Sequence, residues 1–199
     1  MENNFENKKC LKTLVGDNVY LSPISLDDVE KYAEMVNDIK VSVGLGYLSY
    51  TNIIDFESEN EFLISVKKEK MFAVRLLEND NLLGNVGFNS VDLLNRTATM
   101  GIMLGNSNYQ RKGYGIEAVK LILDYGFSFL NLRNISLSVF KYNEVAYNLY
   151  KKAGFKEAGR LRKAVEIMGK TYDVIIMDML KEEFQSVYIK RELEKRYNL

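Results

Sequence analysis

Histidine is absent from the 199 residues, and this absence removes several kinds of catalytic site at once. Without imidazole there is no Ser–His or Cys–His nucleophile pair and no HExxH-type zinc site. Cysteine is almost as scarce. Cys10 is the only one, so neither an internal disulfide nor a thiolate metal cluster can form, which suits a reducing compartment. Any proton transfer must therefore use carboxylate, tyrosine, lysine, cysteine or water.

Neither sign of charge is in excess, and no long apolar run is present. The 27 basic residues balance the 27 acidic ones, so a broad basic face for nucleic acid is not expected. No stretch reaches the ~18 apolar residues of a membrane span, and the polar start at residues 1–6 lacks the apolar core of a secretory signal. We therefore expect a cytoplasmic protein without a membrane or nucleic-acid partner.

A single domain over residues 1–199, with its core at about 17–184, is expected because domains cluster at roughly 100–200 residues. No repeat, low-complexity tract or linker divides the chain. Branched and apolar runs predict strands at 19–24, 71–77, 82–91, 96–104, 135–140, 160–166 and 172–179. Helices are predicted at 25–37, 57–68, 113–130, 143–153 and 182–197, the last strongly charged, with a loop at 43–50. This order indicates an α/β (α+β) domain with helices on both faces of one sheet.

A basic, glycine-rich segment, Gln110-Arg111-Lys112-Gly113-Tyr114-Gly115, lies between a predicted strand and a long predicted helix. Glycine lets the backbone turn tightly and approach a ligand closely. Free N–H groups and the positive dipole end at a helix start form an anion site, and Arg111 and Lys112 add charge beside it. A Walker loop would need GxxxxGK(S/T), and a Rossmann loop a third glycine in place of Ala118. The segment suits a pyrophosphate, although alone it also fits a glycine turn with solvated basic side chains.

Two segments together resemble a known family. Residues 109–118 (YQRKGYGIEA) resemble the Q/R-x-x-G-x-G/A acetyl-CoA loop of the GNAT superfamily, and residues 143–155 (NEVAYNLYKKAGF) resemble its N-x-x-A-x-x-x-Y-x-x-x-G-F segment. The resemblance covers about residues 17–184 and is closest to the branch that contains ribosomal-protein N-terminal acetyltransferases. It implies a strongly bent, mixed sheet of about seven strands. In this sheet the strands at 96–104 and 135–140 splay apart.

The resemblance further implies acetyl-CoA as co-substrate and no metal. Its pantetheine would lie between the splayed strands and its pyrophosphate on the loop. The cofactor-binding residues so implied are Ile102, Met103, Leu104, Gln110, Arg111, Lys112, Gly113, Tyr114, Gly115, Ile116 and Asn143. The family tyrosine that matches Tyr150 lies near the thioester sulfur and can protonate the departing thiolate, because a phenol of pKa about 10 is protonated at neutral pH. Without this context, Asn143 and Tyr150 would be a helix N-cap and a core tyrosine.

The general base is left open by the sequence. Thr99 stands where the related branch has the glutamate of an A-E-(I/F)-G segment, and a hydroxyl is no base at neutral pH, although it can orient a water. Other carboxylates that could line the amine site are Asp92, Glu57, Glu166 and Asp173, each also explained as a solvated surface charge. We expect direct attack of a neutral amine with water-relayed proton loss. Proximity and backbone N–H groups of the strand at 96–104 would supply the acceleration.

The sequence thus predicts an N-acetyltransferase acting on a primary amine of a small molecule or peptide. A peptide or protein N-terminus, or an amino-sugar, is favoured because an α-amino group has pKa about 8, against about 10.4 for a lysine-like amine. Alternatives are a polyamine or other small-amine acceptor, a non-catalytic acyl-CoA sensor, and a structural partner acting through its charged C-terminal helix. The chain could also form a homodimer.

Overall fold

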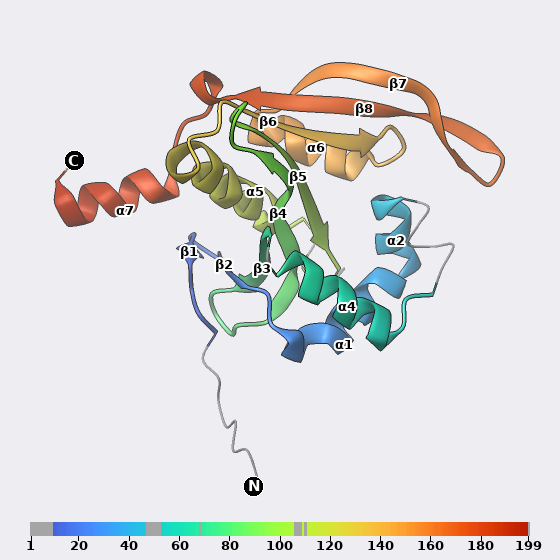
Figure 1. Cartoon of the computed structure of the whole chain (residues 1–199), viewed down its shortest axis with the longest axis horizontal. Coiled ribbons are helices and arrows are strands. Elements are labelled where there is room, and N and C mark those ends of the chain that lie inside the picture. Colours follow the sequence, from blue (N-terminus) through green and yellow to red (C-terminus); the bar gives the residue numbers. More distant parts are fainter. Residues whose placement is uncertain (1–9, 47–52, 68, 106–108, 110, 199) are drawn as a thin grey trace, which may run out of the picture.

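Eight strands join into one open sheet in the order β1-β2-β3-β4-β5-β6-β8-β7 (Figure 1). The computed structural model describes residues 10–46, 53–67, 69–105, 109 and 111–198. The strands are β1 (Leu14–Val15), β2 (Val19–Pro23), β3 (Lys70–Leu76), β4 (Leu82–Asp92), β5 (Thr97–Leu104), β6 (Asn134–Phe140), β7 (Lys156–Ile167) and β8 (Lys170–Leu180). Neighbours are antiparallel except β5 and β6, which are parallel. All seven predicted strands are present; the additional one, β1, is too short for a periodic pattern to reveal.

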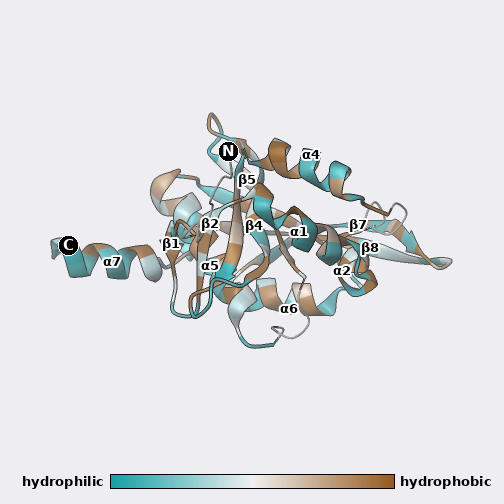
Figure 2. Cartoon of the chain, turned by 90° about the horizontal axis from the view of Figure 1, so that it is seen from below, coloured by the Kyte–Doolittle hydropathy of each residue, from teal (hydrophilic) through white to brown (hydrophobic). Residues whose placement is uncertain are grey.

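Helices cover parts of both faces of this sheet. They are η1 (Leu26–Asp28), α1 (Val29–Asn37), α2 (Ile39–Leu45), α4 (Phe56–Val66), α5 (Tyr114–Asp124), the π-helical η3 (Tyr125–Phe129), α6 (Glu144–Ala153), η4 (Lys181–Glu183) and α7 (Tyr188–Tyr197). Seen from below, α4 and α6 lie on opposite sides of the strands (Figure 2). No helix of the described part is long and apolar enough to cross a membrane. The predicted α/β domain with one mixed sheet is confirmed.

Two apolar clusters fill the space between these layers. The larger cluster joins the buried face of α5 to the strands, with Ala118, Val119 and Ile122 against residues such as Phe88 and Ile135. The smaller cluster lies on the other face, between α1, α4 and the first strands, and contains Tyr32, Leu63, Ala73 and Met103. The strands at the centre of the sheet are therefore held from both sides.

The prediction of a loop at 43–50 is wrong at its start. Residues 43–45 form the end of α2, and residues 47–50 lie outside the described part. Asp38 caps α2 by accepting a hydrogen bond from Lys40 N, and Val41 is buried. Branched residues and Gly44 have weak helix propensity, so capping and packing override the local preference here.

The predicted start of the C-terminal helix at 182 is also wrong, because α7 begins at Tyr188. A carboxylate distant in sequence sets this start. Asp124, at the end of α5 and fully buried, accepts hydrogen bonds from the backbone N–H groups of Val187 (3.2 Å), Tyr188 (2.9 Å) and Ile189 (3.2 Å). A negative charge at a helix N-terminus satisfies its free donors and favours its dipole. From this anchor α7 projects away from the sheet (Figure 1).

Candidate active site

Strands β5 and β6 run side by side over three residues only. The register joins Thr97 to Asn134, Ala98 to Ile135 and Thr99 to Ser136. Because β5 continues to Leu104 and β6 to Phe140, the two strands diverge beyond Thr99 and Ser136 (Figure 1). The strands therefore splay apart as the resemblance implied, and Thr99 and Ser136 mark the vertex of a V.

The edge of β5 that faces this V has no strand partner beyond Thr99 among the described residues, while its other edge is paired with β4. Ile102, Met103 and Leu104 lie on this stretch. Ile102 and Leu104 pack against the larger cluster, and Met103 is buried in the smaller one. Their side chains hold β5 between the two layers, so the unpaired backbone edge is available for an extended ligand.

The start of α5 lies beside the end of β5, where a Cβ at Gly115 would be 3.1 Å from Leu104 Cδ1. Gly113 caps α5 in the left-handed region (φ 87°), and the first intrahelical bond here runs from Glu117 N to Gly113 O at 3.1 Å. The N–H groups of Tyr114, Gly115 and Ile116 therefore have no acceptor inside the helix. A Cβ at Gly113 would meet no described atom within 4 Å, so none of the described residues fills the space beside these donors.

The other residues of the predicted loop have different roles. Arg111 and Lys112 are exposed, and the Lys112 ammonium lies 5.4 Å from the ring centroid of Tyr109. Gly115 allows close packing, because a Cβ there would lie 2.7 Å from Leu149 Cδ1. Gln110 is outside the described residues. The two glycines thus have different structural roles: Gly113 allows the left-handed turn before α5, and Gly115 allows α5 to pack closely against α6.

Tyr150 lies on the buried side of α6, as the helical spacing predicts. Its side chain is 6% exposed and meets the Phe155 ring edge-to-face, with 5.9 Å between centroids. Burial raises the pKa of the Tyr150 phenol to about 12. No hydrogen bond to another described residue holds its hydroxyl. The group is therefore a protonated donor at neutral pH with its O–H uncommitted.

Asn143 is the N-cap of α6, and its side chain joins this helix to α2. Its Oδ1 accepts a hydrogen bond from Ala146 N (3.1 Å), and its Nδ2 donates to Gly44 O (3.4 Å). The preceding Tyr142 donates its hydroxyl to Val43 O (2.8 Å). Two consecutive residues therefore hold two consecutive carbonyls of α2 next to the end of β6. The cap was expected from the sequence, whereas the contact with α2 was not.

The carboxylates Asp92 and Asp173 both accept hydrogen bonds from backbone N–H groups. Asp92 accepts hydrogen bonds from Asn95 N (2.8 Å) and Asn95 Nδ2 (2.7 Å), which lower the pKa of its carboxyl group. Asp173 accepts one from Lys163 N (3.0 Å) in the β7–β8 hairpin. Neither carboxylate is paired with Thr99 in the register of the sheet.

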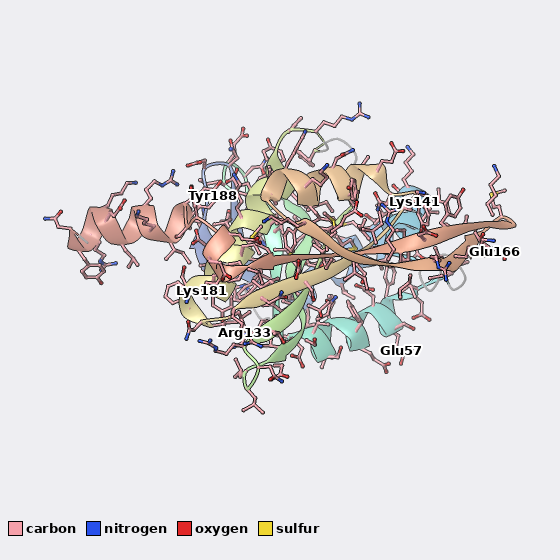
Figure 3. All side chains as sticks on the ribbon, turned by 90° about the horizontal axis from the view of Figure 1, so that it is seen from above. Glu57, Arg133, Lys141, Glu166, Lys181 and Tyr188 are labelled. Atoms are coloured by element: carbon pink, nitrogen blue, oxygen red, sulfur yellow. The ribbon has the colours of Figure 1, made fainter. Side chains whose placement is uncertain are left out.

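Glu57 and Glu166 lie on different elements and are exposed. Figure 3 shows Glu57 on α4 and Glu166 toward the far end of the β7–β8 hairpin. The buried carboxylate of α4 is instead Glu59, 3% exposed, whose Oε1 has no hydrogen-bond partner among the described residues. Burial raises the pKa of Glu59. Its i, i+4 spacing from the core residue Leu63 could have shown that it points inward.

Sequence reasoning also missed the neighbours of Thr99 across the sheet. The register places Ser136 beside Thr99, and Asp178 of β8 beside Ser136. The alternation of residues 135–140 (ISLSVF) puts Ser136 on the polar face, but no local pattern reveals which strand follows β6 in the sheet. In the described part, no group of three or more Cys, Asp or Glu residues is placed to hold a metal ion.

Comparison with known proteins shows which family has this sequence and fold. Residues 18–156 match the model of the acetyltransferase (GNAT) domain. The N-acetyltransferase p20 of Bacillus licheniformis, itself uncharacterized, is 28% identical over 87% of this chain and 99% of its own length. The spermidine N(1)-acetyltransferase of Escherichia coli K12 is 32% identical over 68% of this chain and 66% of its own. The crystal structure of spermidine N-acetyltransferase from Vibrio cholerae, in complex with CoA and spermine, superposes with TM-score 0.74 at 26% identity, covering 83% of this chain and 96% of that one.

Proposed function

The chain belongs to the acetyltransferase (GNAT) family of acetyl-CoA-dependent N-acetyltransferases, and we propose that it acetylates a primary amine by direct attack of the neutral amine on the thioester. The splayed pair of strands carries the proposal: β5 and β6 part beyond Thr99 and Ser136, α5 begins with free N–H groups, and α6 carries the buried, protonated Tyr150. An acyl thioester held in the V would have an anion site at one end and a proton donor at the other.

The proposed acetyl-CoA contacts follow the order of these elements. The pyrophosphate would lie on the N–H groups of Tyr114, Gly115 and Ile116, with Arg111 and Lys112 adding positive charge. The left-handed Gly113 leaves this approach open. The pantetheine would run along the unpaired edge at Ile102, Met103 and Leu104. Gln110 and Asn143 remain proposed contacts, and Asn143 would have to share its side chain with the cap of α6.

In the proposed chemistry, the amine lone pair forms the new C–N bond at the thioester carbonyl. The C–S bond then breaks with its electron pair on sulfur, and the Tyr150 O–H donates the proton that makes the free thiol. A phenol of pKa about 12 stays protonated until it is used. Backbone N–H groups on the edge of β5 would polarise the carbonyl.

The acceptor is proposed to be an amine of low pKa, such as a peptide or protein N-terminus or an amino-sugar. Within the described part of the chain, Thr99 at the vertex has the hydroxyl of Ser136 as its side-chain neighbour instead of a carboxylate, which favours an amine that is already neutral. A protein N-terminus would agree with the resemblance to the ribosomal-protein branch. The relatives named spermidine N-acetyltransferases support a second candidate, a polyamine.

A panel of acceptors tests the proposal. Release of CoA from acetyl-CoA would be followed with a thiol reagent for a short peptide, glucosamine and spermidine, from pH 6.5 to 9.5. We expect turnover with the peptide or the amino-sugar that rises with pH until the amine is neutral. A clear preference for spermidine would refute the low-pKa acceptor, and acetyl-CoA binding without CoA release from any amine would indicate the sensor instead.

A further inference from the structure

A row of polar side chains crosses the sheet through the vertex of the V. The register pairs Ser90 with Thr99, Thr99 with Ser136, Ser136 with Asp178 and Asp178 with Lys156. These five residues come from β4, β5, β6, β8 and β7, which are successive neighbours in the sheet. Residues directly paired in a sheet have side chains on the same face, so the five side chains form one line.

This line lies on the face of the sheet opposite α5. The alternate residues of the same strands, Ala98, Ile135, Met177 and Met179, are buried in the apolar cluster with α5. Thr99, Ser136 and Asp178 are only half-buried. Tyr150 packs into the cluster on the α5 side, whereas the row lies on the polar face, which we take as the side from which the acceptor reaches the vertex.

The contacts within the row suit proton movement. Thr99 Oγ1 lies 3.5 Å from Ser136 Oγ, and Ser136 Oγ also lies 3.4 Å from Ala98 O, so both hydroxyl hydrogens are weakly held. Paired Cβ atoms in an antiparallel sheet are about 4.5–5.5 Å apart, a gap that a rotation of the Ser136 hydroxyl or one bridging water closes toward Asp178. Asn134 Nδ2 donates to Asp178 Oδ2 at 2.8 Å and fixes the carboxylate in this position.

We propose that Asp178 receives the proton lost by the acceptor amine, through the hydroxyls of Thr99 and Ser136. This inference rests on the proposed acetyl transfer and adds the missing path for its proton. Once the C–N bond has formed, the positively charged nitrogen gives an N–H proton to Thr99 Oγ1. Thr99 passes its own hydroxyl proton to Ser136, and Ser136 passes its proton to the Asp178 carboxylate. Each hydroxyl gains one proton and loses one, and Asp178 then returns the proton to solvent.

The charges around Asp178 are compatible with this role. From β7 it faces Lys156, which also forms an ion pair with Glu183. The hydrogen bond to Glu183 is the chief cause of the raised pKa of the Lys156 ammonium, and the charge of Asp178 is a smaller cause. From β6 it faces the uncharged Asn134 and Ser136. The ion-pair partner of Lys156 is thus Glu183, while Asp178 is held through Oδ2 by the uncharged Asn134.

The first test replaces Asp178 with asparagine and uses Asp173→Asn as the matched control. Asp173 lies on the same strand, but outside the row. Asp178→Asn should lower kcat about 10²-fold at pH 7, the lower end of the usual range for a positioned base, with KM for acetyl-CoA unchanged. The loss should shrink as the pH rises toward 9.5, because hydroxide can then take the proton directly, and Asp178→Glu should recover most of it. The control should match the wild type.

The second test uses Ser136→Ala, which leaves the Asn134–Asp178 hydrogen bond in place and guards against a folding defect. It should also lower kcat, and the double variant Asp178→Asn/Ser136→Ala should be no slower than the slower single variant, because residues of one relay act as a unit. Additive losses, or a pH-independent loss shared with Asp173→Asn, would refute the relay. Absence of wild-type turnover with every amine would instead refute the proposed function itself, so the two failures are distinguishable.

Discussion

Replacing Tyr150 with phenylalanine separates a catalytic phenol from a packing tyrosine. The ring and its edge-to-face contact with Phe155 are kept, and only the hydroxyl is lost. That hydroxyl has no hydrogen bond within the described part of the chain, so its removal leaves no buried partner unsatisfied and stability near neutral pH should change little. If the phenol donates the proton to the thiolate, kcat should fall 10²–10⁴-fold, about 3–5 kcal/mol of transition-state stabilisation.

The raised pKa of Tyr150 sharpens this prediction. At pH 10 an unperturbed phenol would be half ionised, whereas a phenol of pKa about 12 is ionised to about 1%. The wild-type rate should therefore not decline between pH 8 and 10 through loss of this proton. Stability should depend on pH for the same reason: because burial raises the folded pKa of Tyr150, the wild type loses stability as the pH rises from 10 through 12. Tyr150→Phe should lose less over this range, but not nothing, because Tyr188 also has its pKa raised to about 12. Acetyl-CoA affinity, measured by calorimetry, serves as the control. Wild-type turnover in Tyr150→Phe from pH 7 to 9 would return Tyr150 to a purely structural role.

Two further substitutions test the cofactor loop and the buried carboxylate of α4. Gly113→Val should weaken acetyl-CoA binding about tenfold or more by calorimetry, since its side chain would enter the open approach to the helix start. Gly169→Val is the matched control, because Gly169 also has a left-handed φ (76°) and open space but lies in the β7–β8 turn, and equal affinities in the two variants would contradict the loop assignment. Glu59→Gln should raise the melting temperature at pH 8 and less so at pH 5, because burial raises the pKa of Glu59 and the wild type loses stability as the pH rises through that value. If the melting temperature of Glu59→Gln at pH 8 were equal to or lower than that of the wild type, the burial of the Glu59 charge would not destabilise the fold, and the reasoning would be refuted.

Local signals were sufficient for most of the fold. The seven predicted strands carry runs of branched or alternating residues, and the helix caps at Ser25 and Asn143 are visible as single side chains. The two wrong predictions, the loop at 43–50 and the helix start at 182, concern elements whose ends are fixed by residues distant in the sequence. The start of α7 depends on Asp124, and the end of α2 rests on Tyr142 and Asn143. No window of neighbouring residues contains either contact.

The same limit applies to the site. The places of Gly113 at a helix start and of Tyr150 on a buried helix face could be predicted, because each belongs to a motif contained within one loop or one helix, and their roles stay predictions. The row that contains Asp178 depends on the register of five strands, and three of its four pairings join residues that are not close in the chain. A shift of one residue in any of these pairings would move a side chain to the other face. Such a row can only be seen once the sheet is built.

The contacts around α2 connect this helix to the start of α6, which carries Tyr150. The vertex itself offers neutral hydroxyls and backbone, which cannot distinguish one amine from another by charge. Discrimination must therefore come from elements that border the V, and α2 is one of them. Its carbonyls at Val43 and Gly44 are held by Tyr142 and Asn143, and Asn143 also caps the helix that carries Tyr150. Because the Asn143 side chain makes both contacts, we expect a substitution that displaces α2 to disturb the start of α6 as well, and with it the position of Tyr150, the proposed proton donor.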